Sequence, residues 1–153
     1  MKNIPDHLAA LAVGAWVGGL WAIGYLAVPI LFHAQPDKQL AGMLAGQMFV
    51  ALGYVGIVCG TYLLLQRLVL SGKAALREPL SLLVAAMLVI SLLIQFGIQP
   101  LMADLKIQAL PLDVMHTAFA DRFRMWHGVS SILYLVESLL GALLVIRSFR
   151  SSK

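Results

Sequence analysis

Residues 126–138 read WHGVSSILYLVES and lie inside the last long apolar segment of the chain. The stretch contains a carboxylate, Glu137, that is far from any sequence break. On a helix, its polar and small residues recur at intervals of three, four and seven and share one stripe, opposite a face of leucine and valine. The stripe consists of His127, Ser130, Ser131, Tyr134, Glu137, Ser138 and Gly141. Because polar groups avoid lipid, we expect this stripe to face other helices.

The rest of the chain has the composition of an integral membrane protein. Of its 153 residues, 61% are hydrophobic and 12% are charged, whereas a soluble domain has about 25% charged residues. This length allows a few spans and no separate soluble domain. The net charge of +4 is scattered over the segment ends, which argues against nucleic-acid binding.

Four apolar segments predict four membrane-spanning helices. They cover about residues 7–32, 40–70, 79–102 and 122–147, and an amphipathic outer segment is expected at about 112–121. Since short connections join antiparallel neighbours, we predict an all-α, antiparallel four-helix bundle forming one membrane domain over residues 1–153. We expect Pro29 to loosen the last turn of the first span and Pro100 to mark the outer end of the third.

Glycine pairs spaced by four residues predict close helix contacts in the first two spans. The pairs are Gly14/Gly18, Gly42/Gly46 and Gly56/Gly60. The same small-residue faces would also serve a homo-oligomer or a larger membrane complex. The sequence therefore predicts the lipid bilayer as a partner and leaves protein partners open.

The positive charges predict an orientation. Seven of the eleven Lys and Arg residues fall on the side of the two termini and the connection between the second and third spans. These are Lys2, Arg67, Lys73, Arg77, Arg147, Arg150 and Lys153. Because Lys and Arg accumulate in cytoplasmic loops, we expect both termini in the cytoplasm.

Polar side chains are predicted at two depths of the bundle, counted at about 1.5 Å per residue from the outer ends of the spans. The outer layer contains Tyr25, Gln47, Gln95, Gln99, His127, Ser130 and Ser131, and Trp21, Tyr54, Tyr134, Glu137 and Ser91 lie nearer the middle. An acid at mid-membrane costs at least about 2.5 kcal/mol, so such a residue is kept when it pairs, protonates or acts. We expect Glu137 to tie its helix to Trp21 or Tyr54 as a protonated or hydrogen-bonded carboxyl group, to handle a proton or cation, or to reach the cytoplasmic interface.

Histidines are the candidates for a metal or haem site. His116 and His127 would lie about 16 Å apart on one helix, too far to share one ion through bonds of about 2.0–2.1 Å. His33 and His127 have similar depths on different segments, which leaves a two-histidine haem or copper site as an alternative. No metal-binding, nucleotide-binding or nucleophile motif occurs in the sequence. We therefore predict no catalytic residue and favour a non-enzymatic role.

Sequence elements at both ends of the chain resemble a known family. They are Trp16-Val17-Gly18-Gly19-Leu20, Tyr25 to Phe32 with Pro29, Ala41 to Phe49, and Phe123 to Ser130. The chain resembles the small bacterial membrane proteins of the domain of unknown function 4149, the transmembrane protein 205-like family. It is also distantly similar to copper-resistance-D-like and HemJ-type proteins, some of which bind haem. The residues that fit the family pattern are Trp16, Gly18, Pro29, Phe32 and His127.

The resemblance implies a bacterial inner-membrane protein with four spans and no established activity. Its animal relatives are associated with resistance to platinum drugs, which implies transport, trafficking or metal handling.

Three functions are consistent with these patterns. The first is binding or moving a small solute or metal ion through an outward-facing polar layer, with Glu137 as its buried end. The candidate ligand or proton residues are Glu137, His127, Tyr134, Ser130, Gln95, Gln99, Gln47, Tyr25 and Tyr54. The second is a haem- or copper-binding redox protein that uses His33 and His127. The third is a structural or accessory subunit of a membrane complex.

Overall fold

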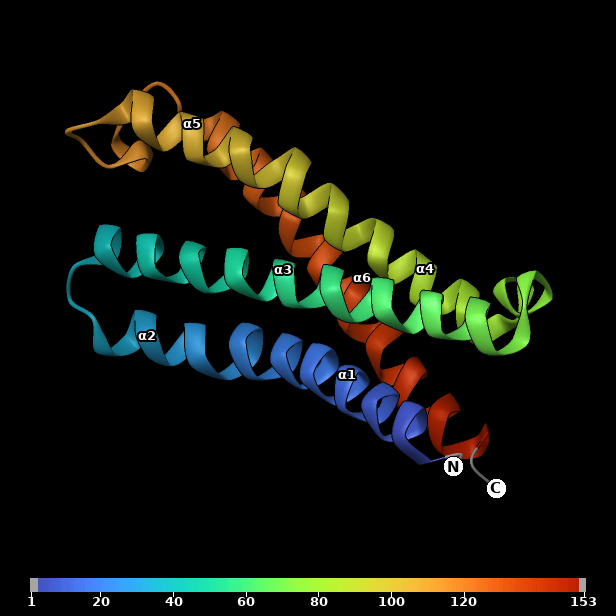
Figure 1. Cartoon of the computed structure of the whole chain (residues 1–153). Helices are drawn as coiled ribbons and strands as arrows, with labels where there is room; N and C mark the ends of the chain where they lie inside the picture. The colour runs from blue at the N-terminus through green and yellow to red at the C-terminus, as the bar shows by residue number, and fades with distance from the viewer. Residues whose placement is uncertain (1–2, 152–153) are drawn as a thin grey trace.

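Four long helical spans form the molecule in the computed structural model, which describes residues 3–151 and the side chains of residues 6–148 (Figure 1). The helices long and apolar enough to cross a membrane are Asp6–Ala34, Lys38–Ser71, Pro79–Ala109 and Ala120–Ser148. The predicted all-α four-span bundle is thereby confirmed. Lys2, Lys153 and the side chain of Arg150, which entered the predicted orientation, lie outside the described residues.

The first and third spans each widen into π-helix at one point. The first consists of α1 (Asn3–Ala22), the π segment η1 (Ile23–Ala27) and α2 (Val28–Ala34), and the third of α4 (Pro79–Leu92), the π segment η3 (Leu93–Ile98) and α5 (Gln99–Ala109). Each π segment ends two residues before a proline, Pro29 or Pro100. Proline lacks an N–H and its ring clashes with the carbonyl four residues earlier, so the preceding turn widens.

The structure differs from what was predicted at Pro29 and at Pro100. The last turn of the first span, where loosening at Pro29 was expected, is regular α-helix in α2, and the widening lies before the proline, in η1. The third span does not end at Pro100 but continues to Ala109. The widened turn of η3 accommodates the proline ring, so the helix passes through it.

The second span, α3 (Lys38–Ser71), lies between the first and third spans (Figure 1). Its first turn is capped by Asp37, whose Oδ1 accepts hydrogen bonds from the backbone N–H groups of Gln39 and Leu40 at 2.9 and 3.0 Å. It ends at Gly72, whose φ of +74° favours glycine. A short 3₁₀ helix, η2 (Lys73–Arg77), then leads into α4.

The connection from α5 to the last span, α6 (Ala120–Ser151), differs from the expected amphipathic helix at 112–121. Only one 3₁₀ turn, η4 (Val114–His116), forms there, capped by a hydrogen bond from the Met115 N–H to Asp113. Thr117 adopts an extended backbone conformation and its hydroxyl donates to the Val114 carbonyl at 2.8 Å. This bonded turn stops the helix before it can extend into α6.

The two ends of the bundle are packed differently. The described ends of the chain and the α3–α4 connection lie together at one end, which we call the inner end, and the α2–α3 and α5–α6 connections lie at the other, the outer end (Figure 1). The main core cluster consists of Trp16, Val17, Leu20, Leu52, Leu63, Val84, Met87 and Leu144. A second, smaller cluster lies at the outer end and consists of Leu105, Ala109 and Val114 with Phe119, Phe123 and Trp126. Between them, α3 and α5 diverge toward the outer end (Figure 1).

Candidate functional site

One stripe of α3 receives side chains from the other three spans. Its residues alternate at spacings of four and three, which keeps them on one helix face. They are Gly42, Gly46, Phe49, Gly53, Gly56 and Gly60. The stripe covers 18 residues of rise, or about 27 Å, so it connects the outer end with the inner half of the bundle.

Trp16 of α1 fills the inner part of this stripe. Its indole is fully buried. A Cβ atom at Gly56 would lie 2.5 Å from its Nε1, and one at Gly60 would lie 2.8 Å from its Cη2. The predicted glycine pair Gly56/Gly60 therefore creates the space in which a tryptophan, rather than a helix backbone, packs.

Glu137 of α6 connects Trp16 to the third span. Its Oε1 accepts a hydrogen bond from Trp16 Nε1 at 3.2 Å and another from the Ser91 hydroxyl of α4 at 2.6 Å. The residue is 2% exposed. The carboxyl group thus joins α1, α4 and α6 directly, and the indole that it binds rests on α3. Its second oxygen, Oε2, accepts no hydrogen bond from the described part of the chain.

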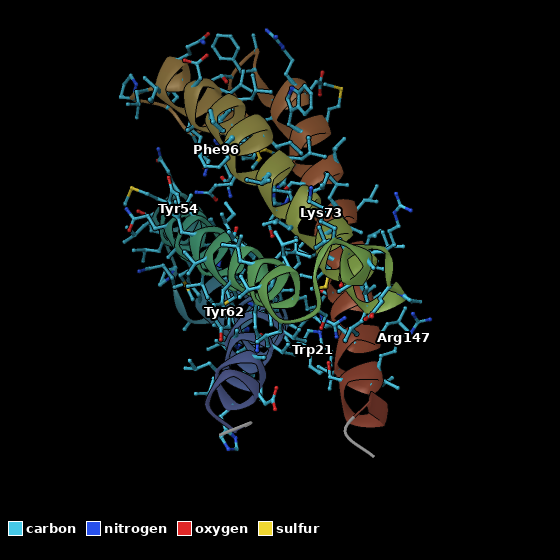
Figure 2. The ribbon with its side chains drawn as sticks, turned by 45° about the vertical axis from the view of Figure 1, so that its right-hand side comes forward. Trp21, Tyr54, Tyr62, Lys73, Phe96 and Arg147 are labelled. Carbon is cyan, nitrogen blue, oxygen red and sulfur yellow. The ribbon has the colours of Figure 1, made fainter. Side chains whose placement is uncertain are left out.

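The partners expected for Glu137 were different. Trp21 instead donates its indole N–H to the Ser138 carbonyl at 3.3 Å and lies between α1 and α6 in Figure 2. Tyr54 is half-exposed and packs edge-on against Phe96, with ring centroids 6.4 Å apart. The depth count was adequate, but it does not determine which way a side chain points around the helix, so it favoured the wrong aromatic residues.

Tyr134 of α6 occupies the next level toward the outer end. Its hydroxyl donates to the Leu20 carbonyl at 2.6 Å. Its ring lies against Gly24, the second residue of η1, where a Cβ atom would overlap it. The ring centroids of Phe49 and Tyr25 lie 5.2 and 6.2 Å away. A tyrosine from α6 is thus inserted beside the π segment of the first span.

Gln95 lies within the second π segment, η3. It is 6% exposed, and its Oε1 would be overlapped by any Cβ atom at Gly53. That oxygen is buried and has no hydrogen-bond partner in the described part of the chain. An unpaired polar group in an apolar interior costs about 1–3 kcal/mol. A hydrogen-bond donor placed beside this amide oxygen would therefore be stabilising.

Lys106 of α5 bridges the diverging helices at the outer end. Its ammonium group lies 3.4 Å from the Gly42 carbonyl and 5.4 Å from the centroid of the Phe123 ring. The Phe123 ring in turn stacks on His127, with centroids 5.9 Å apart. Lys106 was missed as a site residue because the sequence placed it in a connection. Its spacing of seven residues from Gln99 was the available signal.

The remaining outer-layer candidates are less enclosed. Gln47 and Tyr25 are exposed, whereas Gln99 and Ser130 are half-buried. Their side chains make no hydrogen bonds in the described part of the chain. Ser131 is exposed and its hydroxyl donates to the His127 carbonyl at 2.8 Å, inside its own helix.

The histidines of the haem alternative, His33 and His127, are both exposed. They belong to α2 and α6, and α3 lies between α2 and the α5–α6 connection at the outer end (Figure 1). Among the described residues, no group of three or more His, Cys, Asp and Glu side chains could hold a metal ion. A two-histidine haem site remains a prediction.

The predicted glycine pairs have three different environments. A Cβ atom at Gly14 or Gly18 would meet nothing within 4 Å, so this face of α1 is uncovered. Gly42 and Gly46 have ordinary contacts, at 3.9 Å, with Phe32 and Lys106. Only Gly56 and Gly60 have close contacts, and those are with Trp16 and Leu88.

The fold and these contacts define the chain as a small four-span α-helical membrane protein, three of whose spans meet at a buried carboxyl group. More specifically, it belongs to the family described as Domain of unknown function (DUF4149), whose sequence model matches residues 11–110. The matched region includes Trp16, Ser91, Gln95 and Lys106 but not Glu137 of α6. No curated protein and no solved structure matches the chain.

Proposed function

We propose that this protein resides in a bacterial inner membrane with both termini in the cytoplasm and binds a small polar solute in its outer half. The observation that carries this proposal is the buried Gln95 amide, whose oxygen has no partner in the described chain. A solute with a hydrogen-bond donor supplies what this oxygen lacks. The family match and the four apolar spans support a membrane location, and the proposal adds the inner membrane, the orientation and the ligand.

The surroundings of Gln95 support a site rather than a packing defect. Along α3, Gly53 lies one helical turn from Phe49, so the Gln95 amide and the Tyr134 ring contact neighbouring levels of the same stripe. Both π segments contribute to this region, and π segments in α-helices occur frequently at functional sites. Apolar walls with a few polar groups that fix orientation are typical of small-molecule sites.

The inner half supports binding rather than free passage. Below Gln95, the main core cluster fills the bundle with fully buried side chains such as Met87 and Leu144. Glu137 lies at the boundary between the polar outer region and this core. Its unpaired Oε2 is suited to accept a proton or a donor group from a ligand above it. Moving a solute further inward requires a second arrangement of the inner core.

Measuring whether water reaches the outer half of the bundle tests this proposal. In a Cys59→Ser background, Tyr25→Cys and Leu26→Cys place thiols at the same depth, at residues that are 52% and 61% exposed. A charged, membrane-impermeant methanethiosulfonate added to the outer side of the membrane should modify Tyr25→Cys at least tenfold faster than Leu26→Cys. Thiols ionise only in contact with water, and the proposal places water beside Tyr25 and lipid beside Leu26. Equal and slow modification of both would mean that this face contacts lipid, and the proposal would be wrong.

The role of Gln95 is tested on small molecules that remain bound during purification. Wild type and the control Phe96→Leu, which alters an exposed neighbour, should release the same polar solute on denaturation. Gln95→Leu should release at least tenfold less. Mass spectrometry and metal analysis of the same samples distinguish an organic solute from a metal ion. If all three preparations release the same molecules in the same amounts, Gln95 does not bind the solute.

An accessory-subunit function is a second candidate, and the uncovered Gly14/Gly18 face of α1 favours it. Small residues allow close approach of another transmembrane helix. Gly14→Leu should then abolish co-purification of a partner or of a second copy in mild detergent, and Val58→Leu on the exposed face of α3 should not. The haem alternative has a direct test, since a Soret band lost in His127→Ala would establish it.

A further inference from the structure

A basic pocket lies at the inner end of the bundle, far along the spans from the proposed solute site. It is an open hollow at the surface, lined by Lys73, Ala74 and Arg77. All three belong to the 3₁₀ helix η2 between α3 and α4, and Figure 2 marks Lys73 on this connection. The pocket is thus formed by a single short turn that carries two cations.

No carboxylate among the described side chains, residues 6–148, neutralises the two cations of this pocket. The connection contains one acidic residue, Glu78, and its carboxylate pairs with Arg67 at 3.0 Å. Arg67 also donates to the Ser81 hydroxyl at 3.3 Å. Lys73 and Arg77 make no ion pair in the described part of the chain. The neighbouring carboxylate is therefore engaged elsewhere, and two positive charges remain available.

The backbone under the pocket is held in place. Gly72 makes the turn with a positive φ of 74°, and its carbonyl accepts from the Ala75 N–H at 3.2 Å. Ala75 is buried, and its carbonyl accepts from the Glu78 N–H, also at 3.2 Å. A ligand at Lys73 and Arg77 would meet a preformed turn and not a loose loop.

The location of the pocket indicates which anion it meets. The pocket directly follows the end of α3 at Ser71 and precedes the start of α4 at Pro79. The last turn of α3 exposes Val69 and Leu70, which are 81% and 62% accessible. Apolar surface on one side and unpaired cations on the other match a lipid, with acyl chains beside the helix and a charged headgroup beyond its end.

We infer that Lys73 and Arg77 bind the phosphate headgroup of an anionic phospholipid at the inner membrane surface. Arg77 can offer two parallel N–H donors to phosphate oxygens, and Lys73, which lines the same pocket, adds a compact charge. Each basic residue near such a surface strengthens binding about fivefold, or about 30-fold for the pair. The site is independent of the proposed solute site because no residue is shared.

The experiment is lipid retention by purified protein. Wild type is reconstituted in nanodiscs of equimolar phosphatidylcholine and phosphatidylglycerol, released into detergent and measured by native mass spectrometry. Retained lipid should be strongly enriched in phosphatidylglycerol. The double variant Lys73→Gln/Arg77→Gln should lose this enrichment by about 30-fold, whereas the exchange Lys73→Arg/Arg77→Lys should keep most of it.

A matched control removes two charges from the other end of the bundle. Arg122→Gln/Arg124→Gln should retain phosphatidylglycerol like wild type, since both residues lie at the start of α6. All targeted side chains are exposed, and far-ultraviolet circular dichroism verifies the fold of each variant. Equal enrichment in wild type and Lys73→Gln/Arg77→Gln overturns the inference. Displacement of the lipid by equimolar inorganic phosphate overturns it too, because the site would then be one for a free anion.

Discussion

The inner and outer halves of this bundle handle polar groups in opposite ways. In the inner half, Trp16 and Ser91 both donate to Oε1 of Glu137 among buried apolar side chains, which leaves only Oε2 of this group without a partner in the described chain. In the outer half, the helices diverge, and Gln95 holds the one fully buried side-chain nitrogen or oxygen atom of the described chain that has no partner. Since an unpaired polar group costs stability, the comparison indicates that the inner half holds the fold together, and the unpaired amide of the outer half is the group to which we assign the proposed solute.

The largest expected effect comes from removing the residue on which the inner half depends. Trp16→Ala should lower the free energy of unfolding by about 3–5 kcal/mol, because it empties a fully buried space and leaves Glu137 with one donor. Reversible unfolding in mixed detergent micelles measures this. Leu26→Ala, at an exposed position, is the control and should change little. If Trp16→Ala lowered the free energy of unfolding only slightly, the inner half would not be the part that stabilises the fold.

Filling the space under Trp16 should also destabilise the inner half. Gly60→Ala places a Cβ atom 2.8 Å from the buried indole ring, which has no room to move. Overpacking of this kind costs about 1–3 kcal/mol. Gly14→Ala adds the same methyl group to an open helix face and should be neutral or slightly stabilising. The same unfolding assay applies, and equal values for the two variants would contradict the close packing of Trp16.

Replacing a buried polar residue by leucine should have opposite signs in the two halves. Glu137→Leu leaves the Trp16 N–H and the Ser91 hydroxyl without their acceptor, so a loss of about 1–3 kcal/mol is expected. Gln95→Leu removes an unpaired group, so ligand-free protein should keep its stability or gain up to about 1 kcal/mol. Glu137→Gln retains an acceptor and should lie near wild type. A destabilised Gln95→Leu would show that its amide is satisfied.

The smallest effect is expected at the boundary between the halves. Tyr134→Phe removes the hydrogen bond to the Leu20 carbonyl but keeps the ring beside Gly24. Interhelical hydrogen bonds in membranes average about 0.6 kcal/mol, so the loss should be close to this value. Tyr25→Phe, whose hydroxyl makes no hydrogen bond in the described chain, is the matched control and should not change stability.

The sequence predicted the fold class well because four apolar segments of sufficient length have only one common solution in a membrane. It also identified Glu137 as the buried end of a polar stripe, since a lone acid in an apolar helix has few alternatives. Which side chain it meets depends on the rotation of three other helices about their axes. Counting residues along a helix gives the depth of a side chain but not its direction around the helix axis. Trp16 was therefore not recognised as the partner of Glu137.

The sequence identified the polar residues of the outer half but did not predict which of them contact one another. Gln95, Tyr25 and Tyr134 were all selected, yet their contacts depend on η1 and η3, which no propensity scale marks. The bridge from Lys106 to Gly42 was missed because Pro100 indicated the end of the third span, and the helix continues past it. His127, predicted as a candidate ligand residue of the outer layer, is an exposed ring stacked on Phe123, and its role stays a prediction.

The two π segments have a consequence for how this chain can change over time. Each adds a residue to one turn, and one residue corresponds to a rotation of about 100° around a helix. Because the widened turn accommodates this extra residue, deleting a single codon within Ile23–Ala27 or Leu93–Ile98 would return the turn to α-helix and leave the residues on both sides on their present faces. The two spans can therefore accept a single-residue deletion at these segments, whereas the same deletion in a regular helix such as α3 would rotate everything beyond it by about 100°.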